Sequence, residues 1–177
     1  MLMKKSFLLW MGAMLIIISA GCSSDDGLDK PQSDLNWTPN TLLITNSGNV
    51  DAEECSVTNN KFYIDMMPTD NNCPGFIFHC DIEKSLDLQT LIIQIIVKQN
   101  IGAFQMEETF QLNQFNASLK PIEDWKQLGA TEGSIKLVNK KKVDDKDVLT
   151  FQINNLTFEK GYTINGIVDF EYEGTVY

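Results

Sequence analysis

The residues able to carry out covalent catalysis are few: four cysteines and a single histidine, His79. His79 lies in the alternating run 76–82, which predicts a β-strand with His79 on the outer face and Cys80 on the inner face. Nucleophilic catalysis with a histidine base needs both side chains within hydrogen-bond reach. The nucleophile motif G-x-S-x-G is also missing from the sequence. We therefore expect a protein that is not an enzyme.

Three cysteines, Cys55, Cys73 and Cys80, are candidates for a disulfide or a metal site. Pairing the two strands expected on either side of Cys73 brings Cys55 and Cys80 toward one end and leaves Cys73 at the other. A disulfide needs Cα atoms within about 7 Å, so the predicted pair is Cys55–Cys80, with Cys73–Cys80 as the alternative. The spacing lacks the paired C-x₂₋₄-C of zinc sites, and we expect no metal and no cofactor.

Carboxylates are abundant, with 24 Asp and Glu in the chain. The adjacent acids Glu107-Glu108 and Glu123-Asp124 keep a carboxylate-based hydrolase open as a distant alternative, since glycosidases use two carboxyl groups. In a chain this acidic, the simpler interpretation is a solvated surface. The run Asp144–Asp147 lacks the glycine and distal glutamate of a calcium loop and predicts a charged hairpin tip.

Four aromatic residues are candidates for a ligand-binding platform, because aromatic faces stack on the apolar faces of sugars. The alternative is that most of them belong to the core or its edge. The candidates are Trp37, Trp125, Tyr162 and Tyr172.

The N-terminal segment has the three parts of a secretory signal peptide. Lys4 and Lys5 precede an uncharged apolar run, which is shorter than the roughly 20 residues of a membrane-spanning helix. The small residues directly before Cys22 resemble the lipobox of bacterial lipoproteins, although Ser19 stands where leucine is usual. The resemblance implies that residues 1–21 are removed and that Cys22 is acylated, for example with palmitate.

The run Ser23-Ser24-Asp25-Asp26 resembles the surface-export tag of Bacteroidota-type lipoproteins. It implies a lipid-anchored protein of the outer membrane that faces the cell surface. If the run is only a linker, the periplasmic face of the outer membrane is the alternative. Residues 22–36 are rich in Ser, Asp, Gly, Pro and Gln, a composition that predicts a flexible tether.

Length and charge limit the number of domains and the classes of partner. Cleavage before Cys22 leaves 156 of 177 residues, which suits a single domain over 37–177. Removing the two leader lysines from 14 Lys+Arg leaves 12 against 24 acids, a net charge of about −12. Such a chain, which has no arginine, does not suit nucleic-acid binding. Attachment to a membrane then depends on the acyl chains of Cys22.

Period-two alternation between turn signals predicts about eight strands and an antiparallel β-sandwich, with a barrel as the alternative. A phase shift at Asn154-Asn155 predicts a β-bulge. Residues 121–129 read as one short helix or as an irregular loop packed by Trp125. The predicted strands cover residues 41–45, 61–67, 76–82, 90–98, 109–113, 134–139, 148–158 and 162–172.

Three segments, Phe110–Leu112, Asn116–Ser118 and Gly133–Leu137, followed by two alternating strands, resemble the closing half of small β-rich lipoproteins of Bacteroidota. These families are mostly uncharacterised, and the resemblance implies a fold and a compartment without a catalytic residue. We therefore expect a non-catalytic accessory lipoprotein that captures a glycan, a peptide or another ligand for an outer-membrane transporter. A structural adhesin or fimbria-like subunit is the alternative.

Overall fold

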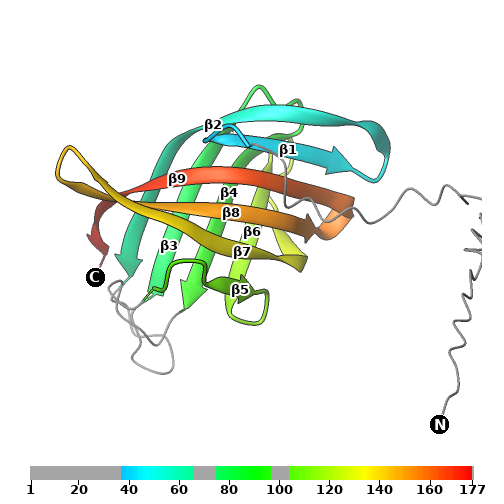
Figure 1. The fold of residues 1–177 in the computed structure, drawn as a ribbon. Coiled ribbons are helices and arrows are strands. Elements are labelled where there is room, and N and C mark those ends of the chain that lie inside the picture. Colours follow the sequence, from blue (N-terminus) through cyan, green and yellow to red (C-terminus); the bar gives the residue numbers. More distant parts are fainter. Residues whose placement is uncertain (1–36, 66–74, 97–103, 177) are drawn as a thin grey trace, which may run out of the picture. The chain divides into compact units, whose positions relative to one another are not determined.

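The computed structural model describes residues 37–65, 75–96 and 104–176. Most of these residues lie in β-strands (Figure 1). No α-helix occurs in these ranges, and the one 3-10 turn is η3 (Glu159–Gly161). Residues 36–177 form one compact unit. The strands are β1 Thr41–Asn46, β2 Asn49–Asp65, β3 Gly75–Glu83, β4 Leu88–Ile96, β5 Thr109–Gln111, β6 Phe115–Pro121, β7 Leu128–Val143, β8 Lys146–Phe158 and β9 Tyr162–Val176.

Eight of the strands close into a barrel, which corrects the predicted sandwich. The ring runs β7-β6-β4-β3-β2-β1-β9-β8 and closes through the long β7–β8 hairpin. β5 is an additional strand that pairs with β7. Alternating apolar and polar residues suit a sandwich and a barrel equally, and the hydrogen bonds that join the last strands to the first make the difference.

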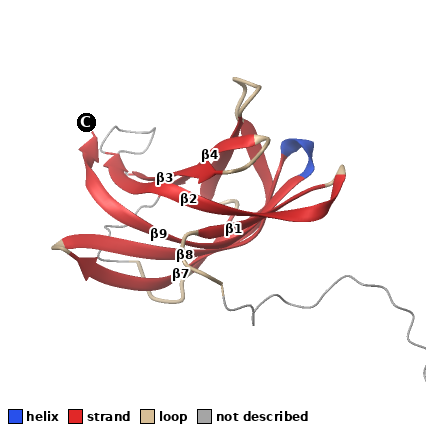
Figure 2. Cartoon of the chain, turned by 90° about the horizontal axis from the view of Figure 1, so that it is seen from above, coloured by secondary structure: helices blue, strands red, loops and turns tan. Residues whose placement is uncertain are grey.

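The ring contains one parallel pairing, between β2 and β9, because the strand between them, β1, is short. β1 starts opposite Ile167, part-way along β9, and runs antiparallel to β9 and β2. Past the first residue of β1, where β1 no longer separates them, β2 and β9 pair directly and in parallel, beginning with Lys61 opposite Glu171. Seen from above, β2–β4 and β7–β9 form the two facing sides of the barrel (Figure 2).

The barrel interior is packed with side chains. The ring of Phe78 lies with its centroid 4.9 Å from that of Phe151, 5.2 Å from Phe170 and 5.5 Å from Phe62. All four side chains are buried. An eight-stranded barrel is just wide enough for side chains to fill it, so the inside is a hydrophobic core. Polar chemistry is therefore placed on the outer face of the barrel.

Several local predictions are confirmed. The inner face of 76–82 is buried as the alternation requires. The β8–β9 register shifts between Ile153 and Leu156, at the predicted bulge. Asp144 and Asp145 form a two-residue hairpin turn with φ of 49° and 66°, the left-handed values that such turns need.

Residues 122–127 form a loop between two strands, so of the two alternatives for 121–129 the irregular loop is confirmed and the short helix is wrong. β6 ends at Pro121, and β7 begins at Leu128. Trp125 lies in this loop with 91% of its surface exposed, so it does not pack the loop either. The alternation in β6 outweighs the weak helical spacing, because Leu119 and Pro121 face the core.

The predicted Cys55–Cys80 disulfide is not formed, and both thiols are free and buried. Thr58 pairs with Asp81, which places Cys80 opposite the irregular segment that follows Thr58. Cys55 therefore lies four to five residues away along β2, about 15 Å at the rise of a strand and far beyond disulfide reach. Burial, and next the charge of Glu53, raises the pKa of Cys55 to about 11, so the thiolate is disfavoured. Cys73 is outside the described residues.

Candidate functional site

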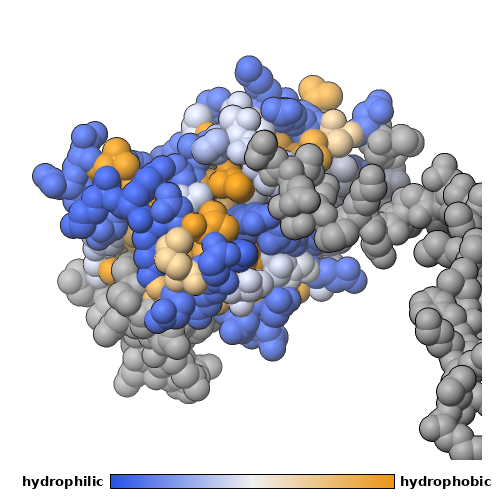
Figure 3. Space-filling model, in the orientation of Figure 1, coloured by the Kyte–Doolittle hydropathy of each residue, from blue (hydrophilic) through white to orange (hydrophobic). Residues whose placement is uncertain are grey.

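A cavity lies on the outer face of the barrel, where β1 begins between β2 and β9. Its volume of about 420 Å³ lies within the usual range for ligand pockets. The surface over β7, β8 and β9 is mostly hydrophilic with small hydrophobic patches (Figure 3). We call this cavity the asparagine pocket; its lining is Asn40, Asn59, Asn60, Lys61, Lys141, Val143, Val148, Asp169 and Glu171.

Asn40 anchors one side of the asparagine pocket. Its φ of 61° is a left-handed value that asparagine tolerates better than most residues. Its backbone N–H donates to the carbonyl of Ile167 at 2.8 Å, and its own carbonyl accepts from the N–H of Val57 at 3.0 Å. These bonds tie Asn40 to β9 and β2 at once, so its side chain is held in place.

Asn60 is oriented by a chain of hydrogen bonds. The backbone N–H of Asp169 donates to Oδ1 of Asn40 at 2.9 Å, which fixes the direction of the Asn40 carboxamide. Nδ2 of Asn60 then donates to the same oxygen at 3.0 Å. Oδ1 of Asn60 must point the other way, where it is buried without a hydrogen-bond partner among the described protein atoms. An unpaired buried acceptor costs roughly 1–3 kcal/mol, so the position calls for a donor.

The charged residues of the asparagine pocket form ion pairs. Nζ of Lys61 lies 3.2 Å from a carboxylate oxygen of Glu171 and 3.0 Å from one of Glu173. Nζ of Lys141 lies 2.6 Å from Asp169, which also accepts a hydrogen bond from the hydroxyl of Thr150. Lys146 bonds to Glu171 from the other side. Three lysines thus balance three carboxylates.

These ion pairs hold the charges in place at neutral pH. The hydrogen bond from Lys146, and next that from Lys61, lowers the pKa of Glu171 below its ordinary value. The hydrogen bonds to Glu173 and Glu171 raise the pKa of Lys61. Glu171 is therefore ionised and Lys61 protonated over the physiological range. Neither group is prepared to exchange a proton near neutrality.

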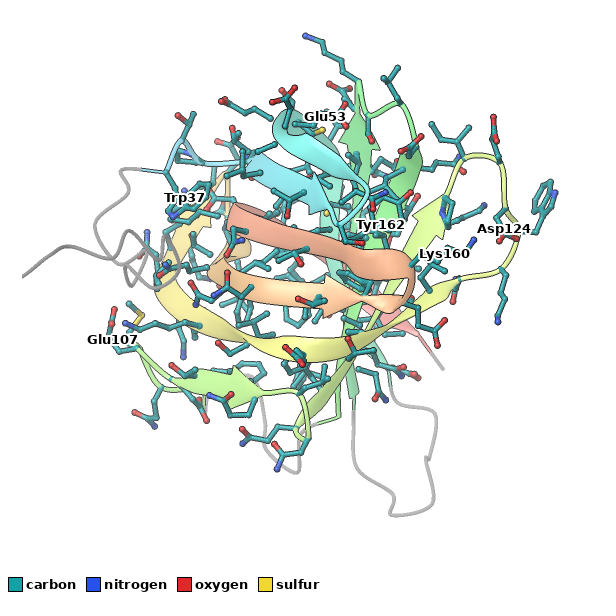
Figure 4. All side chains as sticks on the ribbon, turned by 90° about the vertical axis from the view of Figure 1, so that its right-hand side faces the viewer. Trp37, Glu53, Glu107, Asp124, Lys160 and Tyr162 are labelled. Carbon is teal, nitrogen blue, oxygen red and sulfur yellow. The ribbon has the colours of Figure 1, made fainter. Side chains whose placement is uncertain are left out.

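The four predicted aromatic residues do not gather into one platform. Trp37 and Asp124, the neighbour of Trp125, lie at opposite sides of the view in Figure 4. The ring of Trp125 instead lies under Lys120, whose Nζ is 5.2 Å from its centroid. Tyr172 packs on Phe62 at 5.3 Å between ring centroids.

Tyr162 lies beside a second, much smaller cavity of about 30 Å³, which Asp51, Glu53 and Asp87 also line. This volume is enough for a water molecule but not for a sugar or a peptide side chain. Burial, and next the charge of Asp87, raises the pKa of Tyr162. The tyrosine hydroxyl is therefore a neutral group at the edge of the barrel.

The remaining chemical candidates, His79 and the two acid pairs, pair with local partners and do not come together. Nε2 of His79 lies 3.5 Å from a carboxylate oxygen of Asp81, two residues along the same strand. Glu107 pairs with Lys136, and Glu107 and Asp124 lie far apart in Figure 4. Within residues 37–65, 75–96 and 104–176, no cluster of three or more His, Cys, Asp or Glu residues is arranged to hold a metal ion.

The asparagine pocket was missed because its residues are of common types. A signal does exist: the buried residues Val57 and Phe62 are five positions apart, so the alternation changes phase between them. The structure has a register shift at this point, between Thr58 and Lys61. The same kind of phase shift predicts the bulge at Asn154-Asn155, and at Asn59-Asn60 it indicates a bulge, which borders the pocket.

Comparisons with protein-family models, with curated proteins and with solved structures find no match for this chain. In the part of the chain that the structure describes, none of the helical segments has the length and apolar character needed to cross a membrane. Cys22 and the tether 22–36 lie outside the described residues. Lipid attachment and location remain predictions from the sequence.

Proposed function

We propose that this protein is a surface-exposed lipoprotein of the outer membrane that binds a ligand without transforming it, as an accessory to an outer-membrane transporter. The observation that supports binding is the asparagine pocket, a cavity of ligand size on the outside of a barrel whose interior is full. Because the buried side chains of the described residues pack the barrel interior, we place the ligand on the outer face.

The protonation states favour binding over hydrolysis. A general acid needs a pKa raised toward neutrality, whereas the pKa of Glu171 is lowered by its lysine partners. A lysine nucleophile or base needs a lowered pKa, whereas that of Lys61 is raised. The charged groups of the pocket thus act as fixed hydrogen-bonding groups toward a ligand.

Anchoring is assigned to Cys22. Several acyl chains on one cysteine, at about 0.8 kcal/mol per buried methylene, bind a membrane almost permanently. The tether of residues 22–36, as a flexible coil, spans about 20 Å and lets the barrel stand clear of the headgroups. The asparagine pocket would then be open to ligands outside the cell.

The anchoring part is tested by the Cys22→Ser variant. We expect it to lose palmitate incorporation and recovery with outer membranes, while protease added to intact cells removes the domain of the unchanged protein. Cys55→Ser is the matched control, because the Cys55 thiol is buried and its loss should leave labelling intact. Undiminished labelling of Cys22→Ser would rule out this anchor, and a protease-resistant domain in intact cells would place the protein on the periplasmic face.

The binding part is tested with the full chain, purified in detergent, on arrays that carry glycans and peptides. We expect reproducible binding to at least one chemical class, with no turnover of the bound compound. Silence across all classes would contradict ligand capture. Release of a cleaved product would instead show an enzyme.

A further inference from the structure

We infer that the asparagine pocket takes a neutral, hydroxyl-rich ligand, the uncharged sugar units of a glycan. This inference rests on the proposed binding function and specifies its ligand class. Three features of the pocket carry it: the balance of its charges, the unpaired oxygen of Asn60, and two valines in a lining that is otherwise polar.

The charge balance selects against ionic ligands. Lys61, Lys141 and Lys146 are matched by Asp169, Glu171 and Glu173, although the whole chain carries a net charge of −10. An anion would have to displace carboxylates from the lysines, and a cation would have to displace lysines from the carboxylates. Both exchanges lose existing charge-assisted hydrogen bonds, whereas a neutral ligand leaves the pairs intact.

The hydrogen-bonding groups select a hydroxyl. Oδ1 of Asn60 needs a donor, which an ionised carboxylate or phosphate does not provide. A hydroxyl donates one hydrogen bond and accepts others, so it suits Asn60 and a lysine ammonium together. Because the Asn60 oxygen has no accessible surface, a side chain of the lining moves aside when the ligand binds.

The valines give the pocket an apolar side. Val143 is 43% exposed next to the turn of the β7–β8 hairpin, and the buried Val148 lies opposite Lys141 on the neighbouring strand; both line the cavity. A sugar ring presents C–H groups on one face and hydroxyls at its edge, which matches a polar pocket bordered by aliphatic side chains. None of the described lining residues is aromatic, so hydrogen bonds outweigh stacking in this site.

The test starts with the full chain in detergent on an array of neutral oligosaccharides, sulfated and sialylated oligosaccharides, and peptides. The best neutral oligosaccharide is then titrated by calorimetry against the unchanged protein, Asn60→Ala and the control Asn116→Ala. Asn116 is an exposed asparagine on the outer face of β6, away from the pocket. We expect Asn60→Ala to bind about tenfold more weakly or worse and Asn116→Ala to bind within twofold of the unchanged protein.

Each outcome decides a separate point. Binding of neutral oligosaccharides that Asn60→Ala leaves unchanged would overturn the assigned site. Binding of charged glycans or peptides alone would overturn the ligand class and leave the proposed function standing, and a silent array would overturn both. If Asn60→Ala does not fold, amide chemical-shift changes in the unchanged protein decide: they must cluster at residues 59–61 and 169–171.

Discussion

Two β-bulges in this barrel are both built on asparagine pairs, yet they differ in how completely their polar groups are satisfied. In β8, the backbone N–H of Asn155 donates to Oδ1 of the buried Asn165 at 2.7 Å. In β2, the carboxamide of Asn60 bonds to Asn40 through its nitrogen, and its oxygen is left without a protein partner. The first bulge thus satisfies a backbone N–H with a buried side chain, whereas the second leaves a buried side-chain oxygen unpaired among the described residues.

The two bulges also differ in how tightly their surroundings are packed. Gly133 on β7 lies against the β8 bulge with φ of 115°, and a Cβ there would come within 2.6 Å of Cα of Leu156. The β2 bulge instead borders a cavity of about 420 Å³. The β8 bulge is therefore tightly packed, whereas the asparagines of the β2 bulge line the asparagine pocket.

The largest expected effect is that of Gly133→Ala at the β8 bulge. The added methyl meets backbone atoms, and the left-handed φ is strained for alanine, so we expect a loss of about 3 kcal/mol or more in the free energy of unfolding. Gly129→Ala on the same strand is the matched control, because its Cβ would meet nothing within 4 Å. Urea unfolding of both variants is the measurement. Equal stability of the two would show that the β8 bulge is loosely packed.

An intermediate effect separates Asn165 from Asn60. Asn165→Ala removes the acceptor of the Asn155 N–H and should reduce the free energy of unfolding by about 2 kcal/mol. Asn60→Ala removes one hydrogen bond together with an unpaired oxygen, so its cost should stay below about 1 kcal/mol. Chemical denaturation measures both. If Asn60→Ala is as damaging as Asn165→Ala, the two bulges have the same structural role.

The smallest expected effect is the pH dependence contributed by Glu171. Its pKa in the folded protein lies below the ordinary 4.5, so its stabilising contribution is present above pH 4.5 and is lost as the pH falls through the lowered value. The stability difference between the unchanged protein and Glu171→Gln should therefore shrink on acidification. Glu132→Gln, an exposed acid on β7, is the control. A difference that is constant from pH 6 to pH 3 would contradict the ion pairing of the asparagine pocket.

Local features were predictable because they depend on near neighbours in the sequence. The alternation at 76–82 predicted the buried face of β3, and the phase shift at Asn154-Asn155 predicted its bulge. The outcome for the disulfide was not predictable, because it depends on the register of β2 against β3, in which Ser56, the neighbour of Cys55, lies opposite Glu83 and not Cys80. The alternation of a strand tells which face each residue occupies, but it does not tell which residue of the neighbouring strand lies opposite.

The asparagine pocket was not predictable either, because its residues are far apart in the sequence. Asn40 bonds to the backbone of Asp169, which is 129 positions away. Residue type alone suggested aromatic residues such as Trp37 and Trp125, but the fold places them apart. Common polar residues become a candidate site only when the start of β1 brings three distant strands together.

The sequence by itself determined an all-β chain, the inner and outer faces of its strands, and the expectation of a lipid anchor at Cys22, because these depend on alternation and on a short local motif. The tertiary structure alone decided barrel closure, the separation of Cys55 from Cys80 and the position of the asparagine pocket. The physical reason is that strand pairing is a long-range property. Hydrogen bonds between β1, β2 and β9 carry no local signature, and they settle which side chains meet.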